Sequence, residues 1–257
     1  MISPTGSSNT SDGWYRYSAL ENGARVTRCQ RVSFRFMGLW DTVLSTDWGS
    51  GPAYQLGIPE QFAHVAQAVA LNEFRGQTLR DLPKSVGAFP LESILGEPAP
   101  KDTIRTELGF IGSHADIGGG FASGQNDLAK VALNWMLNQA AKAGVPVGTG
   151  TAPIIANPVL HDKSDNQYTP TGEPAAYEED RTVRYRNGAT TKQRTMAGAG
   201  MEYADTNQFI SYLPGTMDAD GNLVRTPRSD YVTGTVNMPA YLEWLKNHGY
   251  DITLTVQ

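Results

Sequence analysis

The sequence predicts an α/β protein with a mostly parallel sheet, flanking helices and an irregular C-terminal region. Strand and helix patterns alternate between residues 32 and 144, which is typical of parallel strands joined by helices. The strand candidates become continuously apolar, as expected of strands buried on both faces. Beyond residue 145 Pro, Thr, Gly and Asn replace this regularity. We therefore expect a flexible segment or connector at 1–30, a core at 31–150 and an appended region at 151–257.

The first strand is predicted to end at Asp41. Apolar residues alternate from Val32 through Phe36 and then continue as "MGLW", a pattern that indicates a strand entering a buried sheet. The carboxylate of Asp41 then lies at the strand's C-terminal end. The run "EQFAHVAQAVALNEF" over 60–74 repeats apolar residues at helical spacing, with Pro59 where a first turn tolerates it. We expect a helix there, packed on the sheet.

A second strand and a second helix follow. "ELGFIG" at 107–112 reads as a strand that runs into His114 and the glycines 118–120. The segment 126–144 places apolar residues on one helical stripe, with Asn126 or Asp127 able to cap the start and Gly144 the end. This helix has the clearest pattern in the chain.

The remaining segments are shorter. Residues 1–13 have little to bury and should be a disordered segment or a connector, and 145–180 hold no long element. Asn187-Gly188, and more weakly Gly221, favour hairpin turns. The C-terminus predicts a short helix from Pro239 to Gly249, followed by a strand in "DITLTV" at 251–256.

Composition excludes several classes of protein. The net charge of −5 and the lack of a Lys or Arg block argue against nucleic acid as a partner. A single cysteine, Cys29, forms no internal disulfide and reads as a small hydrophobic residue. No apolar run is long enough for a membrane span, and the N-terminus has no features of a signal peptide. Neither phosphate-binding glycine fingerprint is present, so no cofactor is predicted.

Asp41 and His114 have the order expected of the acid and base of a hydrolytic triad. In a serine hydrolase of the α/β type the acid follows the serine in the chain and the histidine comes last. A strand end fixes the acid, and a loop after a later strand places the histidine ring. Each residue also has a simpler explanation: Asp-Thr after a strand is a common turn or cap, and a single histidine at a strand end is often structural.

A metal site is the alternative interpretation of "HADIGGG". His114 and Asp116 would face the same side of an extended segment and could bind a metal as a His-x-Asp pair. A catalytic metal generally needs three protein ligands, and His64, His161 and His248 suggest no second cluster. We therefore expect no metal. The three glycines would allow close backbone approach or exposed N–H groups that hold an anion.

The nucleophile of the triad is missing from the sequence. No serine lies in a Gly-x-Ser-x-Gly segment; none of Ser50, Ser113 and Ser123 has glycine at both flanking positions of that motif. Ser113 directly precedes His114, and neighbouring side chains of an extended segment point apart, which makes a productive Ser–His hydrogen bond improbable.

Several motifs together resemble a known family. "GLWDTV", "HVAQAVALNE", "FIGSHADIGGGF" and "DLAKVALNWMLNQAAKAGV" are similar, in order and spacing, to the α/β-hydrolase group that includes the type VI secretion phospholipase effectors. "NPVLHDKSDN", "EEDRTVRYRNG" and "YLEWLKNHGYDITLTVQ" resemble the C-terminal region of the bacterial effectors. The resemblance covers nearly the whole chain from about residue 30.

This resemblance implies Asp41 as the triad acid and His114 as the base. It implies an antibacterial lipase that cleaves phospholipid esters, a phospholipase of A type. Such a protein is cytoplasmic in the producing cell and then passes through the type VI system, without a signal peptide, into the target-cell periplasm. Membrane phospholipid, a secretion spike component and an immunity protein are the expected partners.

The chain departs from the family pattern at the nucleophile. The family's Gly-Phe-Ser-Arg-Gly elbow precedes the "WDTV" strand, so we expect the serine to lie upstream of Met1 and the chain to supply the C-terminal catalytic portion. The alternative is a non-catalytic interaction or docking fragment of a secreted effector, whose irregular 145–235 region binds a secretion component or a membrane surface.

Overall fold

The structure is a computed structural model, and its architecture is mixed α/β. It describes residues 3–4, 12–43, 58, 61–73, 91–96, 99, 101–148, 152–163, 181–193, 201, 203–214, 219–220 and 231–257. The connector predicted for 1–13 and the turn predicted about Gly221 lie largely outside the described residues.

A parallel sheet of three strands forms the centre of the molecule. Strands β4 (Phe36–Trp40), β5 (His64–Ala70) and β7 (Ile104–Phe110) lie in the order β4-β5-β7. Both pairings are parallel, with Phe36 opposite His64 and His64 opposite Ile104. The strands predicted before Asp41 and His114 are therefore confirmed, and so is the parallel sheet. Because all three strands run the same way, their C-terminal ends meet at one edge.

The predicted helix over 60–74 is wrong, because residues 64–70 form the central strand β5. Every residue of β5 is buried, so its apolar side chains serve both faces of the sheet. A short run that is apolar on both faces matches a helical stripe as well as a buried strand, and the sequence pattern alone cannot separate them. Gln67 illustrates the error: it is fully buried in the strand and bonded to Glu107, instead of lying on a polar helix face.

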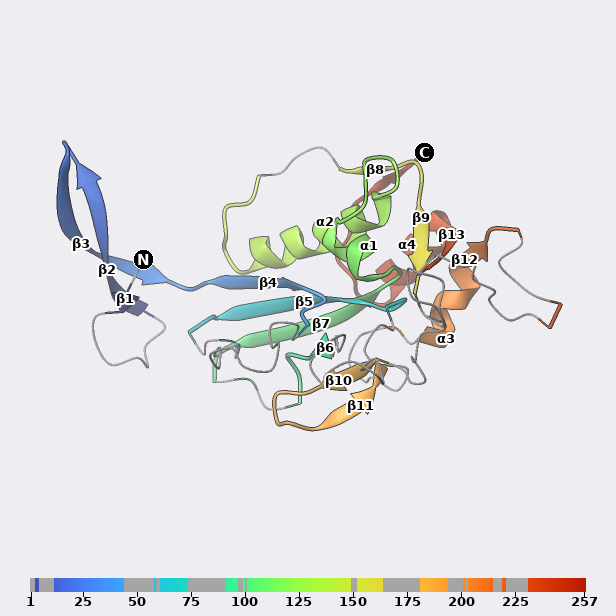
Figure 1. The fold of residues 1–257 in the computed structure, drawn as a ribbon, viewed down its shortest axis with the longest axis horizontal. Helices are drawn as coiled ribbons and strands as arrows, with labels where there is room; N and C mark the ends of the chain where they lie inside the picture. Colours follow the sequence, from blue (N-terminus) through green and yellow to red (C-terminus); the bar gives the residue numbers. More distant parts are fainter. Residues whose placement is uncertain are drawn as a thin grey trace, which may run out of the picture.

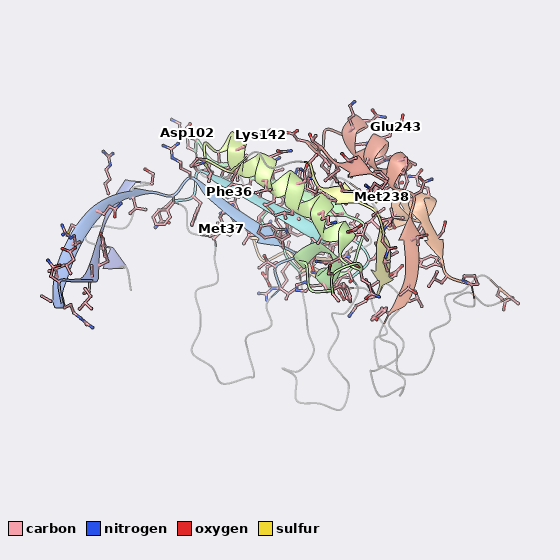
Figure 2. The ribbon with its side chains drawn as sticks, turned by 90° about the horizontal axis from the view of Figure 1, so that it is seen from above. Phe36, Met37, Asp102, Lys142, Met238 and Glu243 are labelled. Atoms are coloured by element: carbon pink, nitrogen blue, oxygen red, sulfur yellow. The ribbon has the colours of Figure 1, made fainter. Side chains whose placement is uncertain are left out.

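Helix α2 (Asp127–Lys142) covers one face of this sheet (Figure 1). Its stripe of Leu128, Val131, Trp135 and Met136 is buried, and Gly144 follows it in a left-handed conformation with φ 76°. The prediction of this helix is confirmed. Seen from above, α2 crosses the strand that carries Phe36 and Met37 (Figure 2). A short helix, α1 (His114–Gly118), connects β7 to α2.

A small mixed sheet lies on the other side of the central sheet from α2 (Figure 1). It contains β6 (Leu91–Glu92), β10 (Thr182–Arg184) and β11 (Thr190–Lys192), in the order β11-β10-β6. Strands β10 and β11 are antiparallel across Gly188, which has φ 83°. The hairpin predicted about Asn187-Gly188 is therefore confirmed.

The C-terminal region adds a second antiparallel sheet and a helix. Its strands lie in the order β12-β13-β9, and the short strands β8 and β14 pair in parallel. The bounds are β8 (Ile154–Ile155), β9 (Val159–Asp162), α3 (Tyr203–Thr206), η2 (Asn207–Phe209), β12 (Ile210–Tyr212), β13 (Val232–Val236), α4 (Met238–Asn247) and β14 (Thr255–Val256). The predicted C-terminal helix is confirmed, whereas the strand predicted over 251–256 is reduced to its last residues.

An N-terminal hairpin projects from the body (Figure 1). Strands β2 (Asp12–Glu21) and β3 (Ala24–Ser33) are antiparallel, and β1 (Ser3–Pro4) pairs with β2. Asn22 and Gly23 form the turn with φ of 50° and 81°, the conformation that Asn-Gly favours in hairpins. The hairpin occupies much of the segment for which the sequence predicted a flexible connector, and Leu20 within it is 76% exposed.

One hydrophobic core joins the central sheet to its covering elements. Trp135 of α2 and Tyr250 both contact the ring of Phe110 on β7, each with ring centres 5.4 Å apart. Tyr241 of α4 is fully buried, and its hydroxyl oxygen accepts a hydrogen bond from the backbone N–H of Ile111 at 3.0 Å. No helix in the described part of the chain has the length and apolar character needed to cross a membrane.

Candidate active site

Asp41 lies at the C-terminal end of β4, where the backbone turns sharply. It has φ 46°, a left-handed conformation that Asp and Asn tolerate better than most residues. Its backbone N–H donates to the carbonyl of Ala68 at 2.7 Å, and its Oδ1 accepts from the backbone N–H of Ala70 at 2.8 Å. The residue is fully buried. The neighbouring strand β5 therefore fixes both the backbone and the carboxylate of Asp41.

His114 meets Asp41 at the same edge of the sheet. Its Nδ1 lies 2.7 Å from Asp41 Oδ2, and its backbone N–H donates to Glu73 Oε2 at 3.2 Å. The His114 side chain is 41% exposed, although the carboxylate it contacts is inaccessible. The two residues that the sequence singled out are thus in direct contact, 73 positions apart in the chain.

Arg181 provides a cationic partner for Asp41. Its Nη2 lies 3.0 Å from Asp41 Oδ2, and both side chains are fully buried. Burial alone would raise the pKa of Asp41, but the charge of Arg181 and the hydrogen bond with His114 more than offset it, so the pKa lies below its ordinary value. Asp41 is therefore ionised at neutral pH. Since a carboxylate only accepts hydrogen bonds, His114 Nδ1 carries a proton and a neutral ring leaves Nε2 as its basic atom.

Ser113 and the triple glycine have structural contacts of their own. The Ser113 hydroxyl donates to Asp116 Oδ2 at 3.1 Å, and the residue is fully buried. Gly119 ends α1 with φ 82°, and the N–H groups of Gly119 and Gly120 both donate to Ala115 O. These two N–H groups are therefore occupied within the chain, in contrast to the anion-holding role considered from the sequence.

The metal interpretation of His114 and Asp116 does not fit the geometry. The two residues lie in a helix, not on one side of an extended segment, and they bond to different partners. Among the described residues, no three His, Cys, Asp or Glu side chains form a group that could hold a metal ion.

The other histidines lie elsewhere. His161 is on β9, and it bonds to Asp116. His248 follows α4 and stacks on Trp244. His64 begins β5, at the opposite edge of the sheet from Asp41.

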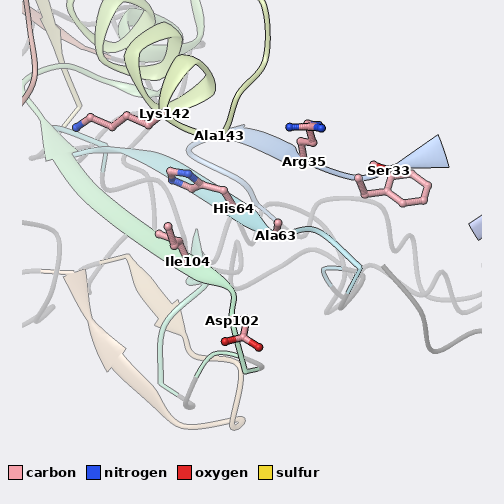
Figure 3. A pocket seen from close by; sticks show the side chains of 9 residues that line it. Ser33, Arg35, Ala63, His64, Asp102, Ile104, Lys142 and Ala143 are labelled. Atoms are coloured by element: carbon pink, nitrogen blue, oxygen red, sulfur yellow. The ribbon is translucent and has the colours of Figure 1, made fainter. Parts of the chain in front are cut away.

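Two hollows lie at opposite ends of the sheet. One, of about 560 Å³, lies between α1, α2 and Trp40, and its lining includes Ile117 and Leu133. The other, of about 360 Å³, lies at the N-terminal ends of the strands, where His64, Arg35 and Lys142 contribute to its wall (Figure 3). Burial, with the nearby charge of Lys142, lowers the pKa of His64. Only the first hollow adjoins the elements that carry Asp41 and His114.

Comparison with known proteins decides the family. A family model described as the catalytic domain of Tle1-like phospholipase effectors of the type VI secretion system matches residues 4–139. The chain belongs to this family. The matched residues include Asp41, His114 and most of α2. No curated protein and no solved structure matches the chain.

Membership in the Tle1-like family gives the chain a broad function. The matching domain is the catalytic part of a phospholipase, so the chain belongs with lipid-ester hydrolases that act on phospholipid. The family consists of type VI effectors, which are secreted into target cells.

Sequence reasoning missed the residues that support the pair. Arg181 follows an acidic run in "EEDRTVRY", and Glu73 and Asn72 follow the strand that was mistaken for a helix. Correct assignment of β5 would have placed Asn72 and Glu73 at the same sheet edge as Asp41 and His114. No local signal marks Arg181, because its contact with Asp41 depends on the tertiary fold.

Proposed function

We propose that Asp41 and His114 are the acid and base of a serine phospholipase with an α/β-hydrolase fold. The observation that carries this proposal is the 2.7 Å contact between His114 Nδ1 and a buried, ionised Asp41. This contact holds the ring in the tautomer that a general base needs, with Nε2 unprotonated. The 41% exposure of the His114 side chain leaves the ring accessible to a reacting group.

The reaction is an acyl transfer followed by hydrolysis. A serine hydroxyl gives its proton to His114 Nε2 as its oxygen attacks the ester carbonyl, and Asp41 stabilises the imidazolium that forms. The proton then passes to the leaving alcohol of the phospholipid. A water molecule then attacks the acyl group on the serine in the same way, so that a fatty acid is released and the serine is restored. Release of one acyl chain from a phospholipid is a phospholipase A reaction.

The nucleophile of this reaction comes from outside the 257 residues. No Gly-x-Ser-x-Gly segment occurs in the sequence. Ser113, the serine next to His114, donates its hydroxyl hydrogen bond to Asp116 and is fully buried. We infer that a segment upstream of Met1, or a separately encoded chain, delivers the serine to the sheet edge where Asp41 and His114 meet.

The hollow beside α1 and α2 supports a lipid substrate. Trp40 directly precedes Asp41, and Ile117 lies in the same short helix as His114; both line this hollow, together with Leu133. Asp41 and His114 do not themselves line the hollow, but two of these apolar side chains come from the elements that carry them, and such a surface suits the acyl chain of the substrate. We place the acyl chain there and the phosphate headgroup toward solvent. We also expect a secretion spike component and an immunity protein as partners in delivery to the target-cell periplasm.

Fluorophosphonate labelling and phospholipid hydrolysis test the proposal on the product of the native gene. Asp41→Asn and His114→Ala should each lower turnover on the order of a thousandfold or more. Asp102→Asn is the matched control, since Asp102 also has a positive φ, of 64°, but lies in an exposed turn before β7. The control should hydrolyse phospholipid at the rate of the unchanged protein.

Four outcomes would contradict parts of this proposal. Full turnover in His114→Ala would remove the residue from the mechanism, and a lowered melting temperature with unchanged turnover would indicate a structural role. Labelling of the 257-residue chain alone would show that the nucleophile lies within it. A gene product that neither reacts with the probe nor hydrolyses phospholipid favours the docking function instead.

A further inference from the structure

A second His–Asp pair contacts the segment that carries His114. His161 Nδ1 is 2.8 Å from Asp116 Oδ1, and the two side chains are 2% and 0% exposed. The pair joins β9 of the C-terminal region to α1. Its geometry resembles that of the Asp41–His114 pair, but it is enclosed on all sides.

Asp116 also accepts hydrogen bonds from Ser113, the residue before His114. Its Oδ2 accepts hydrogen bonds from the Ser113 backbone N–H at 2.9 Å and from the Ser113 hydroxyl at 3.1 Å. The same oxygen accepts from the backbone N–H of His161 at 3.0 Å. Both oxygens of Asp116 are therefore occupied, and His161 supplies a backbone donor and a ring contact. A continuous chain of hydrogen bonds runs from His161 through Asp116 to Ser113.

Aromatic packing fixes the His161 ring in this position. Phe121 stacks on it with ring centres 3.5 Å apart and an angle of 14° between the planes. Tyr231 approaches its edge, with ring centres 5.0 Å apart at 83°. The ring cannot turn away from Asp116 without losing both contacts. It also cannot reach a substrate, since it is 2% exposed where His114 is 41% exposed.

The next residue of β9 makes a parallel connection. Asp162 accepts a hydrogen bond from Asn72 Nδ2 at 3.3 Å, and Asn72 Oδ1 accepts from the Gly112 backbone N–H at 2.9 Å. Strand β9 is thus attached to the chain on both sides of the turn that leads from β7 into α1. The position of the turn depends on β9.

We propose that His161 is a positioning residue for the base of the reaction. Through Asp116 and Ser113 it holds His114 in hydrogen-bond contact with Asp41, so that Nε2 of the ring is oriented to accept the proton of the nucleophile. This inference rests on the proposed function of His114. Displacement of a reacting group by about 1 Å can cost a hundredfold in rate, so loss of this support should lower kcat while KM changes little.

Two substitutions of His161 separate its hydrogen bond from its packing. His161→Phe keeps an aromatic ring against Phe121 but has no donor for Asp116, whereas His161→Asn keeps a donor near the position of Nδ1 and loses the stacked ring. We expect His161→Phe to lower kcat by up to about a hundredfold and His161→Asn to recover most of that loss. A merely structural histidine would give the opposite order, because Phe preserves more of the buried apolar surface.

The proton NMR signal of His114 Nδ1–H reports its position without any need for catalysis. In the 257-residue chain we expect this signal to shift or broaden in His161→Phe and to return toward its original position in His161→Asn. The control is His248→Ala, which removes another stacked histidine, with Nδ1 2.8 Å from Trp244 O, at the end of α4. That control should lower the melting temperature and leave the His114 signal in place.

The two readouts distinguish failure of this inference from failure of the proposed function. A His114 signal that His161→Phe does not move overturns the positioning role, whether or not the protein hydrolyses lipid. Unchanged kcat in His161→Phe, in a protein that does hydrolyse lipid, overturns it as well. If the gene product has no hydrolytic activity but the signal moves, only the proposed function fails. Should His161→Phe not fold, Asp116→Ala removes both oxygens that connect His161 to Ser113, and an unmoved signal in that variant overturns the inference.

Discussion

At the scale of single residues, the site depends on one buried negative charge. Asp41 has no exposed surface, yet its pKa lies below the ordinary value. An isolated buried carboxylate would instead be neutralised. Asp41 stays ionised because it accepts from Ala70 N, contacts His114 Nδ1 and lies 3.0 Å from Arg181 Nη2. Of these partners, Arg181 makes the largest contribution to lowering the pKa of Asp41, through its charge.

Removal of Arg181 should therefore lower the free energy of unfolding substantially. Arg181→Met leaves Asp41 buried without its cation, and loss of one partner from a buried ion pair typically costs about 3–5 kcal/mol. The control is Arg184→Met at the end of β10, the strand that directly follows Arg181; Arg184 pairs with Glu92 at 3.2 Å and is 45% exposed. An exposed pair contributes about 0–1 kcal/mol. Urea unfolding at pH 7 measures both. Equal losses in the two variants would contradict the importance of the buried pair.

The pH dependence of Arg181→Met follows from the same charge. A carboxylate whose folded pKa is lowered contributes stability above its unfolded pKa, about 4, and this stability is lost as pH falls through the folded pKa. Arg181→Met raises the folded pKa of Asp41, so this contribution shrinks. We expect acid unfolding of the variant to begin at a higher pH than in the unchanged protein, as followed by circular dichroism. A midpoint at the same pH would contradict the assignment of Arg181 as the main favourable influence on Asp41.

At the scale of elements, the turn from β7 into α1 sets the position of His114. Gly112 in this turn has φ 136°, and a Cβ added there would lie 2.6 Å from Asp116 Cβ. The space that glycine leaves is therefore filled by α1 itself. Glycine at position 112 is therefore required for the close approach of α1 to the end of β7. This close approach allows Asp116 to contact His161 and His114 to contact Asp41.

Gly112→Ala should displace α1. A positive φ costs a non-glycine residue about 1–2 kcal/mol, and the clash with Asp116 should add about 1–3 kcal/mol. Gly188→Ala is the matched control, because Gly188 also has a positive φ, of 83°, but nothing lies within 4 Å of an added Cβ. Thermal unfolding should show the larger loss in Gly112→Ala, and only that variant should move the His114 NMR signal. A signal that moves equally in both would contradict the steric explanation.

Some of the helices and strands could be predicted from the sequence, and others could not. Helix α2 was predictable because one of its faces is apolar and the other polar, with Asn126 and Gly144 near its ends. Strand β5 was not, since an Ala-rich run buried on both sides has no polar face to reveal its period. The β2–β3 hairpin was also missed, although Asn22-Gly23 marks its turn, because residues 17–33 have no buried side chain and so no buried face to predict.

At the scale of the whole molecule, the site is built from segments far apart in the chain. Asp41 and His114 could be predicted together because the ends of parallel strands meet at one edge of a sheet. Arg181 and His161 could not, since they come from the C-terminal region and reach the site through sheet packing that no local pattern encodes. The C-terminal region therefore completes the support of residues that lie in the part matched by the family model.

A second buried carboxylate gives the molecule an opposing pH dependence. Glu107 on β7 is 2% exposed and accepts hydrogen bonds from Gln67 Nε2 at 2.7 Å, Ser93 Oγ at 2.8 Å and Ile94 N at 3.0 Å. Burial raises its pKa despite these three donors, and the charge of Asp41 raises it further. The folded protein thus holds this proton more tightly than the unfolded chain, whose glutamates titrate near about 4.3.

Stability should consequently fall as pH rises from the unfolded to the folded pKa of Glu107, by about 1.4 kcal/mol for each unit between them. This decline is opposite in sign to the gain from Asp41, so the two carboxylates together should produce a maximum in the pH–stability profile. Glu107→Gln removes the titration while its amide can still accept from Gln67 and donate to Ser93. Urea unfolding between pH 4 and 9 measures this effect. In Glu107→Gln we expect the free energy of unfolding to lose the decline that the titration of Glu107 causes. Glu243→Gln, at an exposed position on α4, is the control and should keep the profile of the unchanged protein; a decline that persists in Glu107→Gln would assign it to another group.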